Sequence, residues 1–361
     1  MNQTLTEILS SYTNALNPGA FQSFKNLTAL PLLGPELHRT IKTLASPGIR
    51  EIFTVTEVSE SGQVPALRVR NAGDDPVLLL DGEELLGGKQ ARVMNSSVLV
   101  PAGAEIHVPV SCCEAGRWQR QSERFRSHGR SLPSSLKSTK HSRVLSNLRT
   151  SERHDADQRE IWRDIARYSR ARGVQSSTAA LGDVFDADRS SLKDYLDAMP
   201  ALPGQVGLVA FVDNQLAGAE MFASAEIYGE VHNKVLHSFA ADAIMSRSRG
   251  DSHLASASEV DELRSLLAEE ELPDRLRLRL EAALERSTAP SPTKAMDFVQ
   301  RILDGEISRH STAGAGTDLR FSHASGNGAA LVDTDTLVHL TAFPTVQVSR
   351  GRQRHRRSRW N

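Results

Sequence analysis

The chain has 361 residues, of which 39% are hydrophobic and 24% are charged, a composition typical of globular proteins with one or two sizeable cores. The 43 Lys and Arg residues nearly balance the 44 Asp and Glu residues, so no overall field favours nucleic acid, an anionic membrane or an acidic substrate. The N-terminus lacks the pattern of a secretory signal, no segment is apolar enough to span a bilayer, and the only two cysteines, Cys112 and Cys113, are adjacent. These features predict a cytoplasmic protein without membrane association or a disulfide framework.

The first third of the chain changes from helical to strand periodicity. Apolar residues at helical spacing predict a helix within residues 1–19. From 20 to 116, short β-branched runs alternate with turn signals, for example at 71–76 and 101–103. This spacing predicts a β-rich half resembling an antiparallel β-sandwich.

The rest of the chain is expected to contain a linker, a second half and a tail. Residues 117–154 are rich in Arg, Lys and Ser, which predicts an exposed, mobile crossing. Residues 155–345 predict a sheet with helices, including a hairpin around Asp213 and Asn214, a helix at 224–245 and a helical segment at 258–309. The Arg-rich residues 346–361 predict a disordered tail. The fold class predicted overall is α+β.

Three carboxylates interrupt an otherwise apolar stretch. Asp81, Glu83 and Glu84 follow the strand that ends at Leu80, and like charges at the end of a core strand need partners. Lys89 and Arg92, across two glycines, are expected to supply them. One of the three carboxylates could then serve as a general acid or base. The alternatives are a charged β-turn with surface ion pairs and, less specifically, a hard-cation site.

A second polar cluster lies at residues 112–118. It combines the Cys112 thiol, the Glu114 carboxylate, the Arg117 guanidinium and the Trp118 indole. Arg117 is suited to grip a phosphate or carboxylate, and Trp118 could stack on a base, so a nucleotide-like ligand would use both. The alternative is that Cys112 is a small core residue and Trp118 covers the edge of a sheet.

The stretches LLLDGEELLGGKQARVMNSSVLVPAG and VPVSCCEAGRW resemble the signature of a bacterial family, the ADP-ribosylglycohydrolase and rhodanese-phosphatase-superfamily-associated protein domain. GQVGLVAFVDNQLAGAEMF and LVHLTAFP resemble its second half, so the similarity spans roughly residues 20 to 345. The resemblance implies a link to ADP-ribose or NAD-derived metabolites. The chain departs from the family pattern at Ala91, where Asn is usual, and at Cys113, where an apolar residue is usual.

Carried over by position, the polar signature of this family falls on a set of residues in both clusters. They are Asp81, Gly82, Glu83, Glu84, Lys89, Gln90, Arg92, Asn95, Cys112, Glu114, Gly116, Arg117 and Trp118.

Other motifs are missing or weak. The sequence contains no Walker pattern, no dinucleotide fingerprint and no GxSxG nucleophile elbow. The basic crossing and the tail could contact nucleic-acid phosphates, but solvated loops are the favoured interpretation. No metal site is predicted, no cofactor is indicated, and the oligomeric state is left open.

The favoured hypothesis is a protein that binds, and could process, an ADP-ribose-like or other phosphorylated ligand. The expected catalytic residues are one of Asp81, Glu83 and Glu84, together with Glu114. The expected ligand-binding residues are Lys89, Gln90, Arg92, Asn95, Arg117 and Trp118, with Cys112 as a further site residue. The alternative is a non-enzymatic interaction module that acts with a genomically associated partner.

Overall fold

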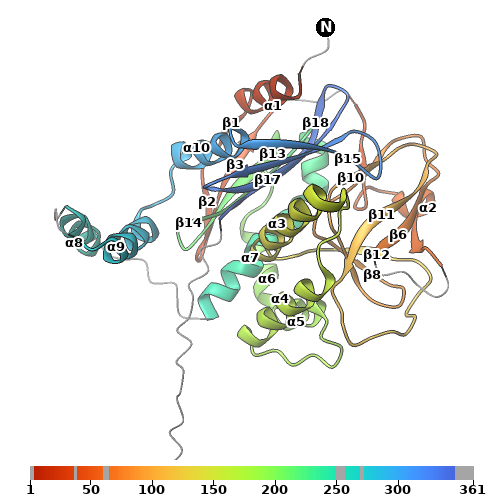
Figure 1. Ribbon diagram of the computed structural model, residues 1–361, viewed down its shortest axis with the longest axis horizontal. Coiled ribbons are helices and arrows are strands. Elements are labelled where there is room, and N and C mark those ends of the chain that lie inside the picture. The colour runs from red at the N-terminus through yellow and green to blue at the C-terminus, as the bar shows by residue number, and fades with distance from the viewer. Residues whose placement is uncertain (1–3, 36–38, 60–64, 249–256, 269–271, 346–361) are drawn as a thin grey trace, which may run out of the picture.

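The computed structural model describes residues 4–35, 39–59, 65–248, 257–268 and 272–345, and its mixed helices and antiparallel sheets confirm the α+β class (Figure 1). The larger sheet has nine strands in the order β1-β3-β13-β14-β18-β17-β16-β15, with β2 also paired to β3. Its strands are β1 (Asn17–Pro18), β2 (Gln22–Phe24), β3 (Leu27–Leu33), β13 (Gln205–Val212), β14 (Gln215–Phe222), β15 (Glu306–Ser311), β16 (Thr317–His323), β17 (Gly326–Asp333) and β18 (Thr336–Pro344).

The second β-rich body consists of a curled six-stranded sheet and a small three-stranded sheet. The six-stranded order is β12-β8-β9-β11-β6-β5, and the small sheet is β10-β7-β4. A bridge between Thr56 and Arg124 and the hydrogen bond from Phe125 N to Val55 O (2.8 Å) bring the two edges of the six-stranded sheet together into a half-barrel. The strands are β4 (Lys42–Thr43), β5 (Phe53–Glu57), β6 (Ala66–Asn71), β7 (Val77–Leu79), β8 (Glu83–Leu86), β9 (Arg92–Met94), β10 (Val98–Val100), β11 (Glu105–Cys112) and β12 (Arg126–Ser131).

Helices cover both faces of the nine-stranded sheet. The helices in the described part of the chain are α1 (Leu5–Asn14), α2 (Ile49–Ile52), α3 (Ser134–Ser151), α4 (Gln158–Ala171), α5 (Leu181–Ala187), α6 (Arg189–Ala198), α7 (Ala225–Ser248), α8 (Ala257–Leu267), α9 (Asp274–Ser287) and α10 (Pro292–Leu303). α1 and α10 share one apolar core with the sheet, whereas α3 and α7 pack on its other face (Figure 1). None of the helices described here has the length and apolar character needed to cross a membrane.

Several elements confirm the sequence patterns. The hairpin turns at Asp213 and Asn214, whose positive φ angles of 50° and 61° suit the tight turn of a two-residue hairpin. Helix α1 begins with a capping box between Thr4 and Glu7, and α7 matches the helix expected at 224–245. Two details differ: residues 17–33 join the nine-stranded sheet rather than the N-terminal body, and the end of the predicted helical segment 258–309 is strand β15. The predicted disordered tail, 346–361, lies outside the described residues.

The prediction of an exposed, mobile crossing at 117–154 is wrong for much of its length. Residues 126–131 form β12 and residues 134–151 form α3, and the α3 side chains of Lys137, Lys140 and His141 are buried. The spacing i, i+3, i+4 puts these three polar groups on one face of the helix. They tolerate burial because carboxylates from distant parts of the chain pair with them. Within this stretch, most of the loop between Ala115 and Arg124 is exposed, as expected.

Candidate functional site

One face of the nine-stranded sheet carries polar residues in two cross-strand rows. In the first row Arg320 pairs with Ala329, Ala329 with Thr341, and Thr341 with Glu220. In the second row Asp318, Leu331, His339 and Phe222 follow one another across the same four strands. Because side chains alternate along a strand, the two rows share one face, while residues such as Leu319 and Leu340 join the apolar core on the other. The small side chain of Ala329 leaves space between its polar neighbours.

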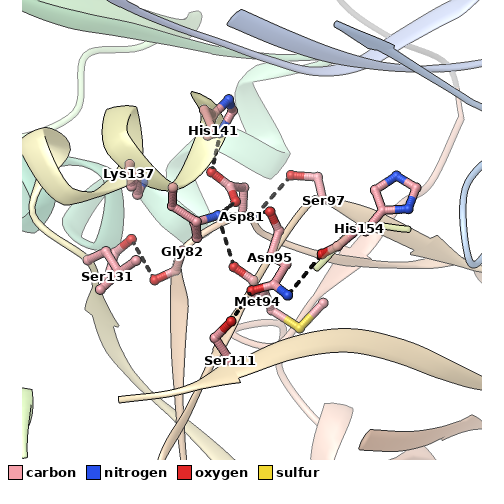
Figure 2. Close-up of polar contacts among 12 residues, drawn as sticks. Asp81, Gly82, Met94, Asn95, Ser97, Ser111, Ser131, Lys137, His141 and His154 are labelled. Atoms are coloured by element: carbon pink, nitrogen blue, oxygen red, sulfur yellow. Dashed lines mark hydrogen bonds and ion pairs between the residues drawn. The ribbon is translucent and has the colours of Figure 1, made fainter. Parts of the chain in front are cut away.

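The buried polar face of α3 lies opposite this sheet. Lys137 Nζ contacts Glu220 Oε1 at 2.6 Å, and Lys140 forms an ion pair with Asp81. His141 Nε2 lies 2.6 Å from Asp81 Oδ2 (Figure 2). A buried ion pair is stable only when its remaining lone pairs and protons are also satisfied. Lys140 meets this requirement, because its Nζ also donates to two backbone carbonyls, at 3.1 and 2.8 Å.

Turns of the half-barrel close the site from a third side. Asp81 follows β7, and its N–H donates to Ser97 Oγ at 3.0 Å (Figure 2). Ser97 precedes β10, and its Oγ lies 2.7 Å from His339 Nδ1 on the sheet. The neighbouring Gly82 has a φ of +72°, and a Cβ there would lie 2.7 Å from Lys137 Cε, so this turn needs glycine to approach α3.

These three walls border a small cavity, in which a volume of only about 10 Å³ is open to a water-sized group. Its lining residues are Asp81, Ser96, Ser97, His141, Asp318, Arg320, Ala329, Ala330, Leu331, His339 and Thr341.

Four buried polar atoms on this lining have no hydrogen-bond partner among the described residues. They are Arg320 Nη1, His141 Nδ1, His339 Nε2 and Thr341 Oγ1. All four side chains are only 2% exposed, so bulk water does not satisfy them. Buried polar atoms without partners are rare because each costs about 1–3 kcal/mol. Their gathering around one cavity is the strongest sign of a ligand site in the described part of the chain.

Charge is balanced around this cavity. Lys140 pairs with Asp81, Arg320 with Asp318, and Lys137 with Glu220. Burial favours a neutral carboxyl at Asp81, but the charge of Lys140 and the hydrogen bond with His141 outweigh it and hold the Asp81 pKa well below its usual range.

Burial lowers the pKa values of both α3 partners of Asp81. Burial lowers the pKa of Lys140 to about 8 against the opposing attraction of Asp81. Burial also lowers the pKa of His141, again opposed by Asp81, so this imidazole is neutral near pH 7. Since Asp81 accepts at Nε2, the neutral ring presents Nδ1 as a proton acceptor.

The structure places the three predicted carboxylates in separate contacts. Lys89 and Arg92 do not neutralise them, contrary to the sequence expectation. Asp81 binds Lys140, Glu83 forms an ion pair with Lys234 of α7, and Glu84 lies 4.0 Å from Arg130. The true partners of Asp81 and Glu83 are distant in the sequence, which spacing along the chain could not reveal.

The carboxylates also bear on the cation-site alternative. Asp81, Glu83 and Glu84 each have a basic side chain as neighbour in place of a shared metal ion. In the described residues, no three His, Cys, Asp or Glu side chains are arranged to hold a metal ion.

The other residues of the first cluster are buried inside the half-barrel. Arg92 Nη2 lies 3.5 Å from Glu57 Oε1, and Cys112 Sγ donates to Gln90 Oε1 at 3.1 Å. Asn95 accepts from Ser111 Oγ at 2.8 Å and donates to the carbonyl of His154 at 2.9 Å (Figure 2).

The two cysteines are buried thiols. Burial raises the pKa of Cys112 to about 11 and that of Cys113 well above its usual value. Because the thiolate is the nucleophilic form, both are poor nucleophiles.

The predicted ligand-binding residues near the end of the signature form a rim cluster, which we define as Lys89, Glu114, Arg117 and Trp118. Arg117 Nε and Nη2 grip Glu114 at 2.6–2.9 Å, so this guanidinium is already paired with a carboxylate. Lys89 Nζ lies 5.4 Å from the centre of the Trp118 ring, and the Trp118 side chain is 52% exposed. The two predicted clusters meet at this rim, where Ala91 N donates to Glu114 Oε2 at 3.1 Å and Arg117 Nη1 donates to Gly88 O at 3.2 Å. The rim cluster does not line the cavity.

An open pocket lies beside the cavity, and one residue links the two. The pocket offers a volume of about 300 Å³, which is at the lower end of the range of small-molecule sites. It is lined by Pro65, Ala66, His107, Val108, Pro109, Arg153, His154, Asp155, Ser311, Thr312 and Ala313. His154 Nε2 lies 2.8 Å from Asp318 Oδ2, and Asp318 lines the cavity. His154 therefore connects the open pocket to the polar network.

Sequence reasoning missed most residues of the cavity. Lys137, Lys140 and His141 lie in the predicted exposed crossing, and the sequence predicts the closing segments only as strands. Polar Asp318 and Arg320 alternate with apolar Leu319 and Phe321, a pattern that predicts a strand with one solvated face, and only the structure shows that this polar face is buried. A buried strand with a charged face is a candidate site.

Residues 15–343 match the family described as the ARG and rhodanese-phosphatase-superfamily-associated protein domain, ARPP-1. Searches among curated proteins and among solved structures found no match. The match spans both β-rich bodies and every residue that lines the cavity. The chain therefore belongs to the ARPP-1 domain family.

Proposed function

We propose that the cavity and the adjoining open pocket bind an ADP-ribose-like or other small phosphorylated ligand, and that the cavity acts on it by acid–base chemistry. The observation that carries the proposal is the convergence of buried polar atoms without hydrogen-bond partners on Arg320, His141 and Thr341, beside His339, whose Nε2 faces Glu220 Oε2 at 3.6 Å. Ligand sites are concave and present a few polar groups at defined positions. The substrate class is supported by the family's description, which associates the family with ADP-ribosylglycohydrolase (ARG) and with rhodanese-phosphatase proteins.

The unpaired atoms suit an anionic or hydroxyl-bearing group. Arg320 Nη1 is a donor and is held by the bond of its Nη2 to Asp318 at 2.7 Å. A fixed guanidinium favours phosphate oxygens. His141, neutral and oriented by Asp81, can take a proton from water or from a ligand hydroxyl. The cavity admits a group of about the size of one water molecule or one phosphate oxygen, so the bulk of a nucleotide-sized ligand would lie in the open pocket.

The test is calorimetric titration of the purified protein with ADP-ribose, NAD and inorganic phosphate. Thr341→Val removes an unpaired hydroxyl without changing side-chain volume appreciably, so a purely structural cavity would tolerate it. We expect affinity to fall about tenfold or more while the melting temperature stays unchanged or rises. Thr56→Val, on β5 of the half-barrel, is the matched control and should bind normally. Lack of binding of all three compounds by the parent protein would refute the proposal.

The exposed rim favours a second candidate function, docking of an acidic protein partner. Trp118 is 52% exposed, and the neighbouring Arg120 and Arg124 are exposed as well. Aromatic and Arg side chains are common at the energetic centres of interfaces. Co-elution of the protein with an ADP-ribosylglycohydrolase encoded nearby, lost in Trp118→Ala but kept in Thr341→Val, would support this candidate over the first.

A further inference from the structure

Ser97 stands at the edge of the cavity in a specific hydrogen-bond arrangement. Its Oγ accepts from Asp81 N at 3.0 Å and lies 2.7 Å from His339 Nδ1. Since the amide can only donate, the serine hydroxyl is free to donate its own proton to Nδ1. That arrangement requires the His339 tautomer with its proton on Nε2. Ser97 is half-buried, whereas His339 is buried, so the hydroxyl is the more accessible member of the pair.

A buried carboxylate lies behind the imidazole. Glu220 Oε2 is 3.6 Å from His339 Nε2, and Glu220 Oε1 is held by Lys137 at 2.6 Å. Burial opposes ionisation of Glu220, but Lys137 and His339 outweigh it and lower its pKa, so this carboxylate is charged. The ring is further fixed by Phe222, whose centroid is 4.5 Å away. Serine, imidazole and carboxylate thus follow one another in the order used by serine nucleophiles.

A second serine–histidine pair shows why the cavity matters. In β15, Ser308 Oγ lies 2.9 Å from His310 Nε2, and Ser308 is also half-buried. This pair does not line the cavity, and no ion pair or hydrogen bond joins His310 to an acidic side chain within the described residues. Ser97 differs because its histidine has Glu220 behind it and because it faces a cavity that holds Arg320.

Arg320 supplies the remaining requirement, a group that stabilises negative charge. Its unpaired Nη1 belongs to a side chain that lines the same cavity as Ser97. A preoriented donor in a dry site is worth far more than the same donor in water.

We propose that Ser97 is a nucleophile that His339 activates and Glu220 orients, a role that rests on the proposed function only for the choice of substrate. Ser97 Oγ forms a bond to the phosphorus or carbonyl carbon of an ester, while its proton moves to His339 Nδ1. The bond to the leaving alcohol breaks, and His339 returns the proton to that alcohol. Water then attacks the Ser97 ester, with its proton taken by His339 or His141, and releases the acid and the free serine.

A fluorophosphonate probe tests the nucleophile without knowledge of the substrate. Ser97 Oγ would bond to phosphorus as fluoride leaves, and peptide mass spectrometry would locate the adduct. We expect the label on Ser97, its loss in Ser97→Ala, and labelling about 100-fold slower in His339→Gln. Ser308→Ala is the matched control and should label at Ser97 at the parent rate. No adduct, or an adduct elsewhere, in the folded parent protein overturns the proposal.

Ser97→Cys provides a second measurement that does not depend on the stability of the His339 variant. A thiol beside His339 should react with iodoacetamide near neutral pH, whereas the buried Cys112 and Cys113 stay unmodified in the folded protein. A variant that reacts no faster than those two cysteines contradicts the proposal. Labelling of Ser97 in a protein that binds no ADP-ribose would reject only the substrate class, and ADP-ribose binding without labelling would reject only the nucleophile.

Discussion

The rim cluster and the cavity lie in one domain and are both rich in charge, but their side chains are satisfied in different ways. At the rim, Arg117 donates three short hydrogen bonds to the Glu114 carboxylate, and Lys89 lies over the exposed Trp118 ring. Around the cavity, the ion pairs are also complete, yet four buried atoms keep no partner in the described structure. Buried polar atoms that the fold leaves unpaired are therefore a better indication of a ligand site than a cluster of charged residues whose charges are already paired.

Burial separates the two regions further. At the rim, the Trp118 side chain is 52% exposed and its contact with Lys89 is open to water, so that contact contributes little to folding. A buried pair costs much to desolvate, and it becomes strongly destabilising when one partner is removed. Mutations in the two regions should therefore differ in size and in kind.

The largest effect is expected for Asp81→Asn. The change leaves Lys140 buried opposite a neutral amide and removes the carboxylate that orients His141. We expect a loss of about 3–5 kcal/mol in the free energy of unfolding, measured by urea denaturation. Asp81→Asn combined with Lys140→Met should recover much of that loss, because no buried charge is left alone. A single variant that loses less than about 1 kcal/mol would show that the pair is not buried as described.

An intermediate, pH-dependent effect is expected for Glu84→Gln. Burial raises the pKa of Glu84 from 4.5 to about 7, although Arg130 opposes the shift. A carboxyl whose pKa is higher in the folded state stabilises fully below pH 4.5, and that contribution is lost as pH rises to about 7.

The variant should therefore match the parent near pH 4.5 and exceed its unfolding free energy by on the order of 3 kcal/mol at pH 8. Denaturation midpoints at several pH values measure the difference. Equal midpoints for the two proteins throughout this range would contradict the raised pKa.

The sequence predicted the elements whose pattern is local. Alternating apolar residues identified most strands, and the turn residues Asp213 and Asn214 identified the hairpin. Helix α3 was missed because basic side chains normally mark a solvated surface. Here the compensating charges arrive from far away: Asp81 is 59 residues before Lys140, and Glu220 is 83 residues after Lys137.

The candidate site shows the same limit. The predicted cluster from 81 to 95 supplies Asp81 to the cavity, whereas Ser97, which also lines it, lies outside the residues that the sequence predicts. The other walls come from α3 and β16 to β18, and the Ser97–His339 contact spans 242 residues. Ser97 lies in no GxSxG motif, so no local pattern identifies it, and strand pairing places Glu220 and His339 next to each other on the sheet.

The smallest effect on folding is expected for Trp118→Ala, and it sharpens the contrast between rim and cavity. The side chain is about half exposed, and its contact with Lys89 is a surface cation–π pair, so the change in unfolding free energy should stay within about 0.5–1 kcal/mol. If the cavity is the ligand site, ADP-ribose titration and fluorophosphonate labelling of this variant should match the parent, whereas Thr341→Val should bind less tightly. A variant that folds normally but loses ADP-ribose binding would move the ligand site to the rim. Retained ADP-ribose binding with loss of a protein partner would instead assign the two regions separate roles, because the exposed indole and the neighbouring Arg120 and Arg124 are available to another chain while the cavity atoms are not.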